Sequence, residues 1–256
     1  MIIKMLFTSP TPDMTGNIKV LWQEAFGDTD EFIDSYMESA YSAKACRCAI
    51  EDNRIVAALH LMDCSVKVEK YAYVYAAATS KAYRGRGIFR SLMRDTEEYL
   101  ISEGYAGMIL VPGDAGLAEM YEKLGFCPFE GLTGTTVLAS GAEKTVLRRV
   151  NAAEYSEERQ KHLPTGAVVM GDAMTAFLER YAELYAGDDF VFARVKAADS
   201  FVASEFFGNK SKMPSVLASL GYACGRFFTQ NGEKRAMYRR FTEGKAPTLL
   251  GACFDL

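Results

Sequence analysis

The chain has 256 residues, of which 49% are hydrophobic and 24% charged, so it can bury a sizeable core and is not a mostly disordered chain. Its formal net charge of -4 argues against wholesale nucleic-acid binding. No apolar run approaches the roughly 20 residues of a membrane span, and the N-terminus lacks a secretory signal pattern, so we expect a cytoplasmic protein without a membrane partner.

Helices and strands are predicted in turn along the first half of the chain. Two helices come first, because apolar residues recur at helical spacing on either side of Gly27. Three strand-like runs follow, the first two joined as a hairpin: 45–50, 54–62 and 71–79. The period then changes, and a loop leads into a helix, a short apolar strand and a second helix: 88–102, 108–111 and 115–124. More strand-like sequence continues to about Val150.

A polar stretch after Val150 separates two predicted units. We interpret residues 151–165 as a connecting helix or linker between units 1–150 and 166–256. In the second unit the pattern predicts a helix, two strands and a helix, with two closing strands after them: 172–185, 190–195, 200–207 and 211–220. We therefore expect an α/β fold, with a mixed, mostly antiparallel sheet flanked by helices and a second, smaller α/β unit.

Cysteine and histidine are sparse: there are six cysteines without a CxxC pair and two histidines, His60 and His162. This pattern predicts neither a zinc site nor a disulfide framework, so we expect no metal cofactor. The cysteines are expected to be small buried side chains in a reducing compartment. Cys46 and Cys48, two apart in a strand-like run, should share one face.

The loop Arg84-Gly85-Arg86-Gly87 before the helix at 88–102 is the most informative segment. Glycines let the backbone approach a ligand closely, and amides that open a helix point toward an anion. Five cations gather within 14 residues of an otherwise acidic chain: Lys81, Arg84, Arg86, Arg90 and Arg94. The chain has neither the P-loop motif nor the dinucleotide fingerprint, so the pattern favours a pyrophosphate held mainly by backbone amides.

Two short motifs together resemble the core of the GNAT superfamily of acyl-CoA-dependent N-acyltransferases. The first is Arg84, Gly87 and Phe89 between a strand and a helix, and the second is a helix that ends in Tyr121, Gly125 and Phe126. The resemblance covers about residues 1 to 140. It implies acyl transfer from acetyl-CoA, or another short acyl-CoA, to a primary amine by direct attack. The second unit is similar to a degenerate copy of the same fold.

The resemblance also assigns roles to individual residues. The strand end formed by Ala77, Ala78 and Thr79 would pair with the pantetheine arm of CoA. The diphosphate would be held by the amides of the loop and the first helical residue: Arg84, Gly85, Arg86, Gly87 and Ile88. Asp114 would lie near the pantetheine, and Tyr121 would be the general acid that protonates the departing thiolate. Phe89 replaces a small family residue, so its side chain would point into the core or narrow the space beside the diphosphate.

The general base is left open by the sequence. The two central strands contain no carboxylate, and the candidates elsewhere are Glu24, His60, Asp63 and Asp114, with water as a further route for the proton. In two-domain GNAT proteins of the enhanced intracellular survival type the C-terminal carboxylate serves as base. By that resemblance the carboxylate of Leu256 is a catalytic candidate.

Two patterns bear on the acceptor. Acidic residues cluster between Asp28 and Glu38, as either a solvated helix face or an acidic rim for a cationic amine. Alternate tyrosines on one strand form either core packing or an aromatic acceptor pocket: Tyr71, Tyr73 and Tyr75.

The function that the sequence favours is N-acyl transfer to the amine of a small molecule or a peptide. The alternative is a non-catalytic acyl-CoA-binding or regulatory protein, and a homodimer is possible.

Overall fold

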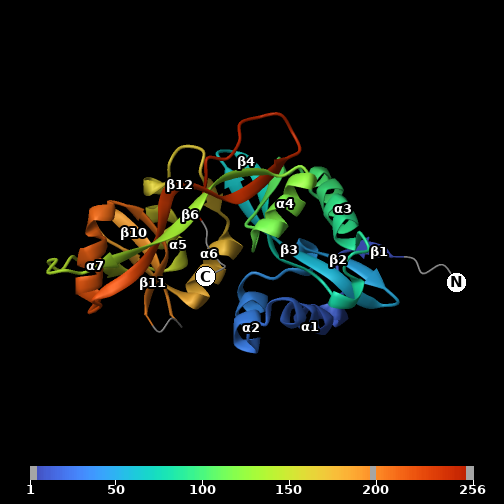
Figure 1. Cartoon of the computed structure of the whole chain (residues 1–256), viewed down its shortest axis with the longest axis horizontal. Helices are drawn as coiled ribbons and strands as arrows, with labels where there is room; N and C mark the ends of the chain where they lie inside the picture. Colours follow the sequence, from blue (N-terminus) through green and yellow to red (C-terminus); the bar gives the residue numbers. More distant parts are fainter. Residues whose placement is uncertain (1–4, 197–199, 252–256) are drawn as a thin grey trace.

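The computed structural model describes residues 5–196 and 200–251, and it confirms the expected fold class (Figure 1). A large mixed sheet runs through both halves of the chain and is flanked by helices. In Figure 1 the N-terminal half, blue to green, lies beside the C-terminal half, orange to red, and β6 and β12 extend from one half into the other. None of the helices in the described ranges has the length and apolar character needed to cross a membrane.

The elements of the first half agree in type and order with the predicted ones, except that a short strand at residues 6–8 was not predicted. They are β1 (Leu6–Thr8), α1 (Thr15–Phe26), α2 (Asp30–Ser39), β2 (Cys46–Glu51), β3 (Arg54–Val66), β4 (Glu69–Thr79), α3 (Ile88–Ser102), β5 (Gly107–Leu110), α4 (Ala115–Lys123) and β6 (Cys127–Leu138). The turn between α1 and α2 forms where expected, because Gly27 takes the left-handed conformation (φ 73°) and the Thr29 side chain caps α2.

The second half departs from the predicted elements, since two short strands, at residues 168–170 and 249–250, were not predicted and two predicted elements differ. Its elements are β7 (Arg148–Arg149), α5 (Ala152–His162), β8 (Val168–Met170), α6 (Asp172–Tyr181), β9 (Ala182–Ala186), β10 (Phe190–Val195), β11 (Phe201–Gly208), α7 (Met213–Leu220), β12 (Cys224–Arg240) and β13 (Leu249–Leu250). The predicted helix 172–185 was too long, because residues 182–186 alternate between buried and half-buried and pair with β10. The two predicted closing strands are one strand, β12, whose pairing with β6 shifts register near residues 230–236.

The order of strands along the sheet is β1-β2-β3-β4-β5-β12-β11-β10-β9-β7. The last residues of β12, Met237–Arg240, pair with β5, whereas its first residues pair in parallel with β11. β8 also pairs with β3. The predicted units 1–150 and 166–256 therefore share main-chain hydrogen bonds, and the sheet has no break at residue 150.

The stretch predicted as a connecting helix or linker contains helix α5, which packs against the second half of the chain. The Asn151 side chain and Glu154 form a capping box at its start. Arg159 and Tyr155 on α5 both bond the Glu205 carboxylate, at 2.8 and 2.6 Å, and all three side chains are buried. A buried ion pair is stable only when its polar atoms have hydrogen-bond partners, as they do here. These contacts fix α5 against the second half of the chain.

The two faces of β4 carry different side chains. Tyr71, Tyr73 and Tyr75 belong to the apolar cluster beneath α2 and α6, and Ala72 and Val74 belong to the cluster beneath α3 and α4. The expectation that the tyrosines share a face is therefore confirmed, and all three pack in the core, which was one of the two interpretations left open.

The cysteines follow the expectation in part. Cys46 and Cys48 share a face, with Sγ atoms 3.7 Å apart, and are buried together with Cys64. Cys127 and Cys224 are exposed, contrary to the expectation, because both begin strands at the rim of the sheet.

Candidate active site

The site begins where β4 and β5 separate. The two strands pair in parallel only at residues 71–73 and 107–109, and β4 continues to Thr79 while β5 ends at Leu110. Ala76 has a positive φ of 45°, and the pairing of β4 with β3 shifts register beside it. This bulge turns the strand away from β5, so the edge of residues 77–79 faces a cavity instead of a neighbouring strand.

The glycine loop opens α3 as the sequence predicts. Gly85 and Gly87 both have a φ of 75°, a conformation that side chains rarely adopt. Gly87 is the N-cap and has no side chain, so the first-turn amides of α3 receive no side-chain acceptor at that position. Such amides, together with the helix dipole, form a site for an anion.

A cavity of about 750 Å³ joins the loop, the free edge of β4 and α4. Nine of the predicted site residues line it: Ala77, Ala78, Thr79, Arg84, Gly85, Gly87, Ile88, Asp114 and Tyr121. Arg86 is not part of this lining, because its guanidinium lies over the Tyr83 ring, 5.0 Å from the ring centre. Arg84 donates to the carbonyl of Thr79 at 3.0 Å, which ties the loop to the strand end.

Tyr121 lies on α4 and reaches the cavity from the side opposite α1. Its side chain is buried, and this burial raises its pKa to about 12. The rings of Phe126 and Phe89 pack edge-on against it, with centroid distances of 5.3 and 6.0 Å. Phe89 therefore packs on the core and also lines the larger cavity beside the glycine loop.

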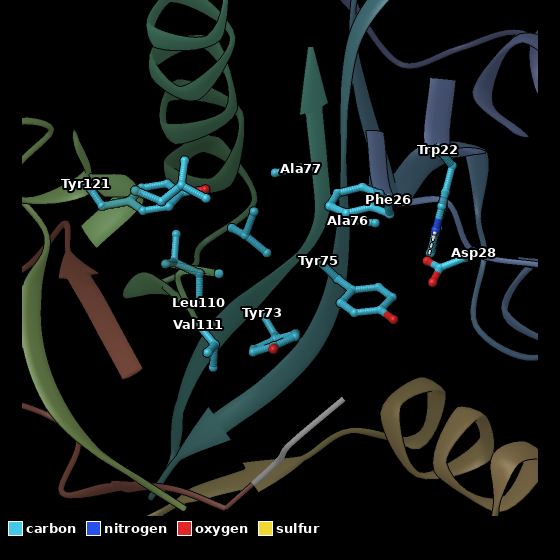
Figure 2. A pocket seen from close by; sticks show the side chains of 13 residues that line it. Trp22, Phe26, Asp28, Tyr73, Tyr75, Ala76, Ala77, Leu110, Val111 and Tyr121 are labelled. Carbon is cyan, nitrogen blue, oxygen red and sulfur yellow. Dashed lines mark hydrogen bonds between the residues drawn. The ribbon is translucent and has the colours of Figure 1, made fainter. Parts of the chain in front are cut away.

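A second cavity of about 260 Å³ continues from the first (Figure 2). The two share several lining residues: Phe26, Ala77, Gly113, Leu117 and Tyr121. Figure 2 shows Tyr121 at one end of this smaller cavity and Trp22 with Asp28 at the other, with Tyr73 and Tyr75 between them. Tyr73 and Tyr75 thus pack in the core and also form a wall of this cavity.

The four candidate bases lie in different surroundings. Glu24 accepts from the backbone amide of Lys81 at 2.7 Å and is bound to the loop after β4. Asp63 accepts from the hydroxyl of Tyr105, on another part of the sheet. Asp114 lines the larger cavity, but its carboxylate caps α4 by accepting from the amide of Leu117 at 2.7 Å.

His60 is buried among aromatic rings and lines neither cavity. The rings of Trp22 and Tyr36 lie 5.1 Å from it, and burial lowers its pKa to about 3. It is therefore neutral in the neutral pH range. Leu256, the remaining catalytic candidate, lies outside the described residues.

Asp28 lines the smaller cavity, and the sequence analysis assigned it no individual role. Its Oδ2 atom accepts a hydrogen bond from the indole Nε1 of Trp22 at 2.7 Å, across the turn at Gly27. In sequence it was one of several acidic residues after this turn, where a solvated helix face was the simpler interpretation. The spacing of a tryptophan and an aspartate around a helix-ending glycine is the signal that could have singled it out.

Comparisons with known proteins address the same half of the chain. Residues 9–129 match the family model of the acetyltransferase (GNAT) domain. No curated protein sequence matches the chain. The described residues contain no group of His, Cys, Asp and Glu able to hold a metal ion.

Solved structures share the fold over nearly the whole chain. A GCN5-related N-acetyltransferase from Anabaena variabilis ATCC 29413 has a TM-score of 0.71 at 13% identity, over 93% of this chain and 73% of that one. A GCN5-related N-acetyltransferase from Kribbella flavida has 0.69 at 13%, over 93% and 71%. Eis1 from Mycobacterium abscessus has 0.68 at 10%, over 93% and 73%. The likeness in fold therefore includes the second half.

Proposed function

The chain belongs to the GNAT superfamily through its N-terminal half, and on this premise we propose that it transfers an acetyl or short acyl group from acyl-CoA to a primary amine. The observation that carries the proposal is the continuous cavity from the first turn of α3 to the hydroxyl-bearing ring of Tyr121. One end of it suits a diphosphate and the other has a proton donor, as acyl transfer from a CoA thioester requires.

Binding of acyl-CoA would use the backbone more than side chains. The amides at residues 84–88 would bind the diphosphate, with the cations Arg84 and Arg90 at the cavity wall. The strand edge at residues 77–79 would offer its main-chain groups to the amides of pantetheine, because β5 no longer pairs there. This arrangement directs the thioester toward Tyr121, where the two cavities meet.

In the proposed reaction the amine nitrogen attacks the thioester carbonyl carbon directly. The carbon–sulfur bond breaks as the amide forms, and no covalent enzyme intermediate is involved. Tyr121 donates its proton to the departing thiolate, and its raised pKa of about 12 keeps it protonated before the reaction. Holding both substrates in one cavity supplies much of the acceleration.

The proton lost by the attacking amine needs an acceptor. Of the candidates in the sequence, Glu24, His60, Asp63 and Asp114 are bound elsewhere, buried or engaged in a cap. We therefore keep the C-terminal carboxylate of Leu256 as the proposed base. Removal of the last three residues should lower turnover well beyond any loss of stability.

The second candidate function is acyl-CoA binding without catalysis. Phe89 favours it, because this large ring stands where the family has a small residue and packs directly on Tyr121.

Release of free thiol from acetyl-CoA in the presence of a panel of primary amines separates the two candidates. Amine-dependent release supports transfer. Tight acetyl-CoA binding with no release in the presence of any amine would favour the binding protein.

A further inference from the structure

The smaller cavity contains a carboxylate that has no cationic partner within the described chain. Asp28 is half-buried there, and among the described residues no lysine or arginine pairs with it. Two other residues of the same acidic stretch do pair with cations, Asp34 with Lys19 and Glu38 with Arg180. A carboxylate facing a largely apolar cavity is stabilised when a cation joins it.

Aromatic rings line the same cavity as this carboxylate. Trp22 holds Asp28 through its indole N–H, and its ring lies 5.6 Å from the Tyr75 ring and 6.2 Å from the Phe26 ring. All three rings line the same cavity. Ring faces attract ammonium groups at about 6 Å or less, so this end of the cavity combines both means by which proteins bind organic cations.

The end of the cavity where acyl transfer is proposed, beside Tyr121, is separate from the end that contains Asp28. Ala77 and Tyr121 line both cavities, whereas Asp28 and Tyr75 line only the smaller one. Tyr75 and Ala77 lie on either side of the bulge at Ala76 on β4. Figure 2 places Asp28 and Tyr121 at opposite ends. One nitrogen therefore cannot both react beside Tyr121 and contact Asp28.

We propose that the acceptor carries two amino groups, one that reacts beside Tyr121 and a remote ammonium group held by Asp28 among the rings of Trp22, Phe26 and Tyr75. This inference rests on the proposed function and names the substrate class, a short diamine or a longer polyamine. Asp28 is a specificity-determining residue in this arrangement and takes no proton from the reacting nitrogen.

The test compares two acceptors of equal length, putrescine and aminobutanol, which differ in the remote group. We expect kcat/KM for putrescine to exceed that for aminobutanol by about 10- to 100-fold, the range of a charge-assisted hydrogen bond. Asp28→Asn keeps an acceptor for the Trp22 N–H but removes the charge. It should abolish this preference by raising KM for putrescine toward the value for aminobutanol.

Glu31→Gln is the matched control, because Glu31 is exposed on α2 and its loss removes the same charge outside the cavity. It should retain the preference for putrescine. Equal use of both amines by the wild type would overturn the inference, as would an undiminished preference in Asp28→Asn. A uniform fall in kcat for both amines in that variant would also overturn it.

Direct binding keeps the inference separate from the proposed function. We expect calorimetry with the CoA-bound protein to detect putrescine binding to the wild type and to Glu31→Gln, and at least tenfold weaker binding to Asp28→Asn. If acetyl-CoA binds but no amine is acetylated, the proposed function fails while this measurement still decides the inference. Putrescine binding that is absent, or equal in all three proteins, would overturn it.

Discussion

Tyr121 and His60 illustrate how burial changes the chemistry of a single side chain. Desolvation disfavours the charged form of each, so it raises the pKa of the Tyr121 phenol and lowers that of the His60 imidazole. Tyr121 faces a cavity and so retains a proton that it can donate. His60 is enclosed by aromatic rings, and its neutral form packs among them without the cost of burying a charge.

The first prediction concerns Tyr121→Phe, which removes the hydroxyl and keeps the ring against Phe89 and Phe126. Loss of one proton donor typically lowers the rate by about 10²–10⁴-fold. We expect turnover to fall within this range while acetyl-CoA affinity and the unfolding midpoint hardly change. Steady-state kinetics with any accepted amine provide the measurement. Unchanged turnover, with chemistry shown to be rate-limiting, would exclude Tyr121 as the acid.

The second prediction concerns pH and His60. Its folded pKa of about 3 lies below the ordinary value of 6.5, so the unfolded chain binds more protons between these values. Its contribution to stability is complete above pH 6.5 and is lost as the pH falls toward 3. The loss approaches about 1.4 kcal/mol per pH unit within that window.

Urea unfolding at pH 7 and pH 5 measures this effect. His60→Leu should lose about 2 kcal/mol less stability than the wild type between the two pH values. His162→Gln removes the second histidine of the chain, which lies outside this aromatic cluster. This variant should lose as much stability as the wild type between the two pH values. An identical loss in His60→Leu and the wild type would contradict the assignment.

At the scale of elements, the two helices that border the larger cavity begin differently. α4 is capped by the Asp114 carboxylate, so one of its first amides already has an acceptor. α3 begins at Gly87 without a side-chain cap, so its first-turn amides are available to a ligand. The difference explains why an anion would bind at α3 although both helix starts line the same cavity.

The third prediction compares two glycines at opposite ends of α3. Gly87 and Gly104 have φ values of 75° and 77°, and a Cβ would meet no atom within 4 Å at either. Valine at either position should therefore cost a similar strain of about 1–2 kcal/mol. Acetyl-CoA at ~100 times Kd should stabilise the wild type and Gly104→Val by about 2.7 kcal/mol, but not Gly87→Val.

Denaturant unfolding without and with acetyl-CoA measures the strain of each substitution and the stabilisation by the ligand. Equal stabilisation of the two variants would show that the loop at Gly87 does not hold the diphosphate.

At the scale of the whole molecule, β12 connects the two halves. Its end lies against β5 so closely that a Cβ on Gly107 would meet the Arg239 carbonyl at 2.5 Å. Arg239 also bonds Glu97 on α3 at 2.7 Å, and Arg240 bonds Glu69 on β4 at 2.6 Å. The sheet that carries the candidate site is therefore completed by residues near the far end of the chain.

The fourth prediction follows from this sharing. A fragment of residues 1–150 lacks β8 and β12, so the edges of β3 and β5 that they cover are left unpaired. We expect the fragment alone to show no cooperative unfolding transition, and co-expression with residues 151–256 to restore one. The intact chain should unfold in one transition. An isolated 1–150 fragment that unfolds cooperatively and binds acetyl-CoA would contradict this expectation.

Local signals in the sequence determined much of the fold and the part of the site formed by the glycine loop and Tyr121. Helix α3, the glycine loop before it and Tyr121 on α4 depend on nearby residues, through periodicity and backbone preference. These features were predicted with their residues. The misassigned segment at residues 182–186 shows the limit of such signals, because pairing with β10 decides its conformation.

Tertiary structure alone decided the other part of the site, the smaller cavity. Trp22, Asp28 and Tyr75 converge on one cavity because α1 packs on β4, a contact between segments about 50 residues apart that no periodicity reports. The burial that raises the pKa of Tyr121 depends on Phe89 and Phe126 from other elements. The pairing of β12 with β5 joins residues more than a hundred positions apart. Long-range contacts such as these are set by how whole elements pack, and a sequence read locally does not contain them.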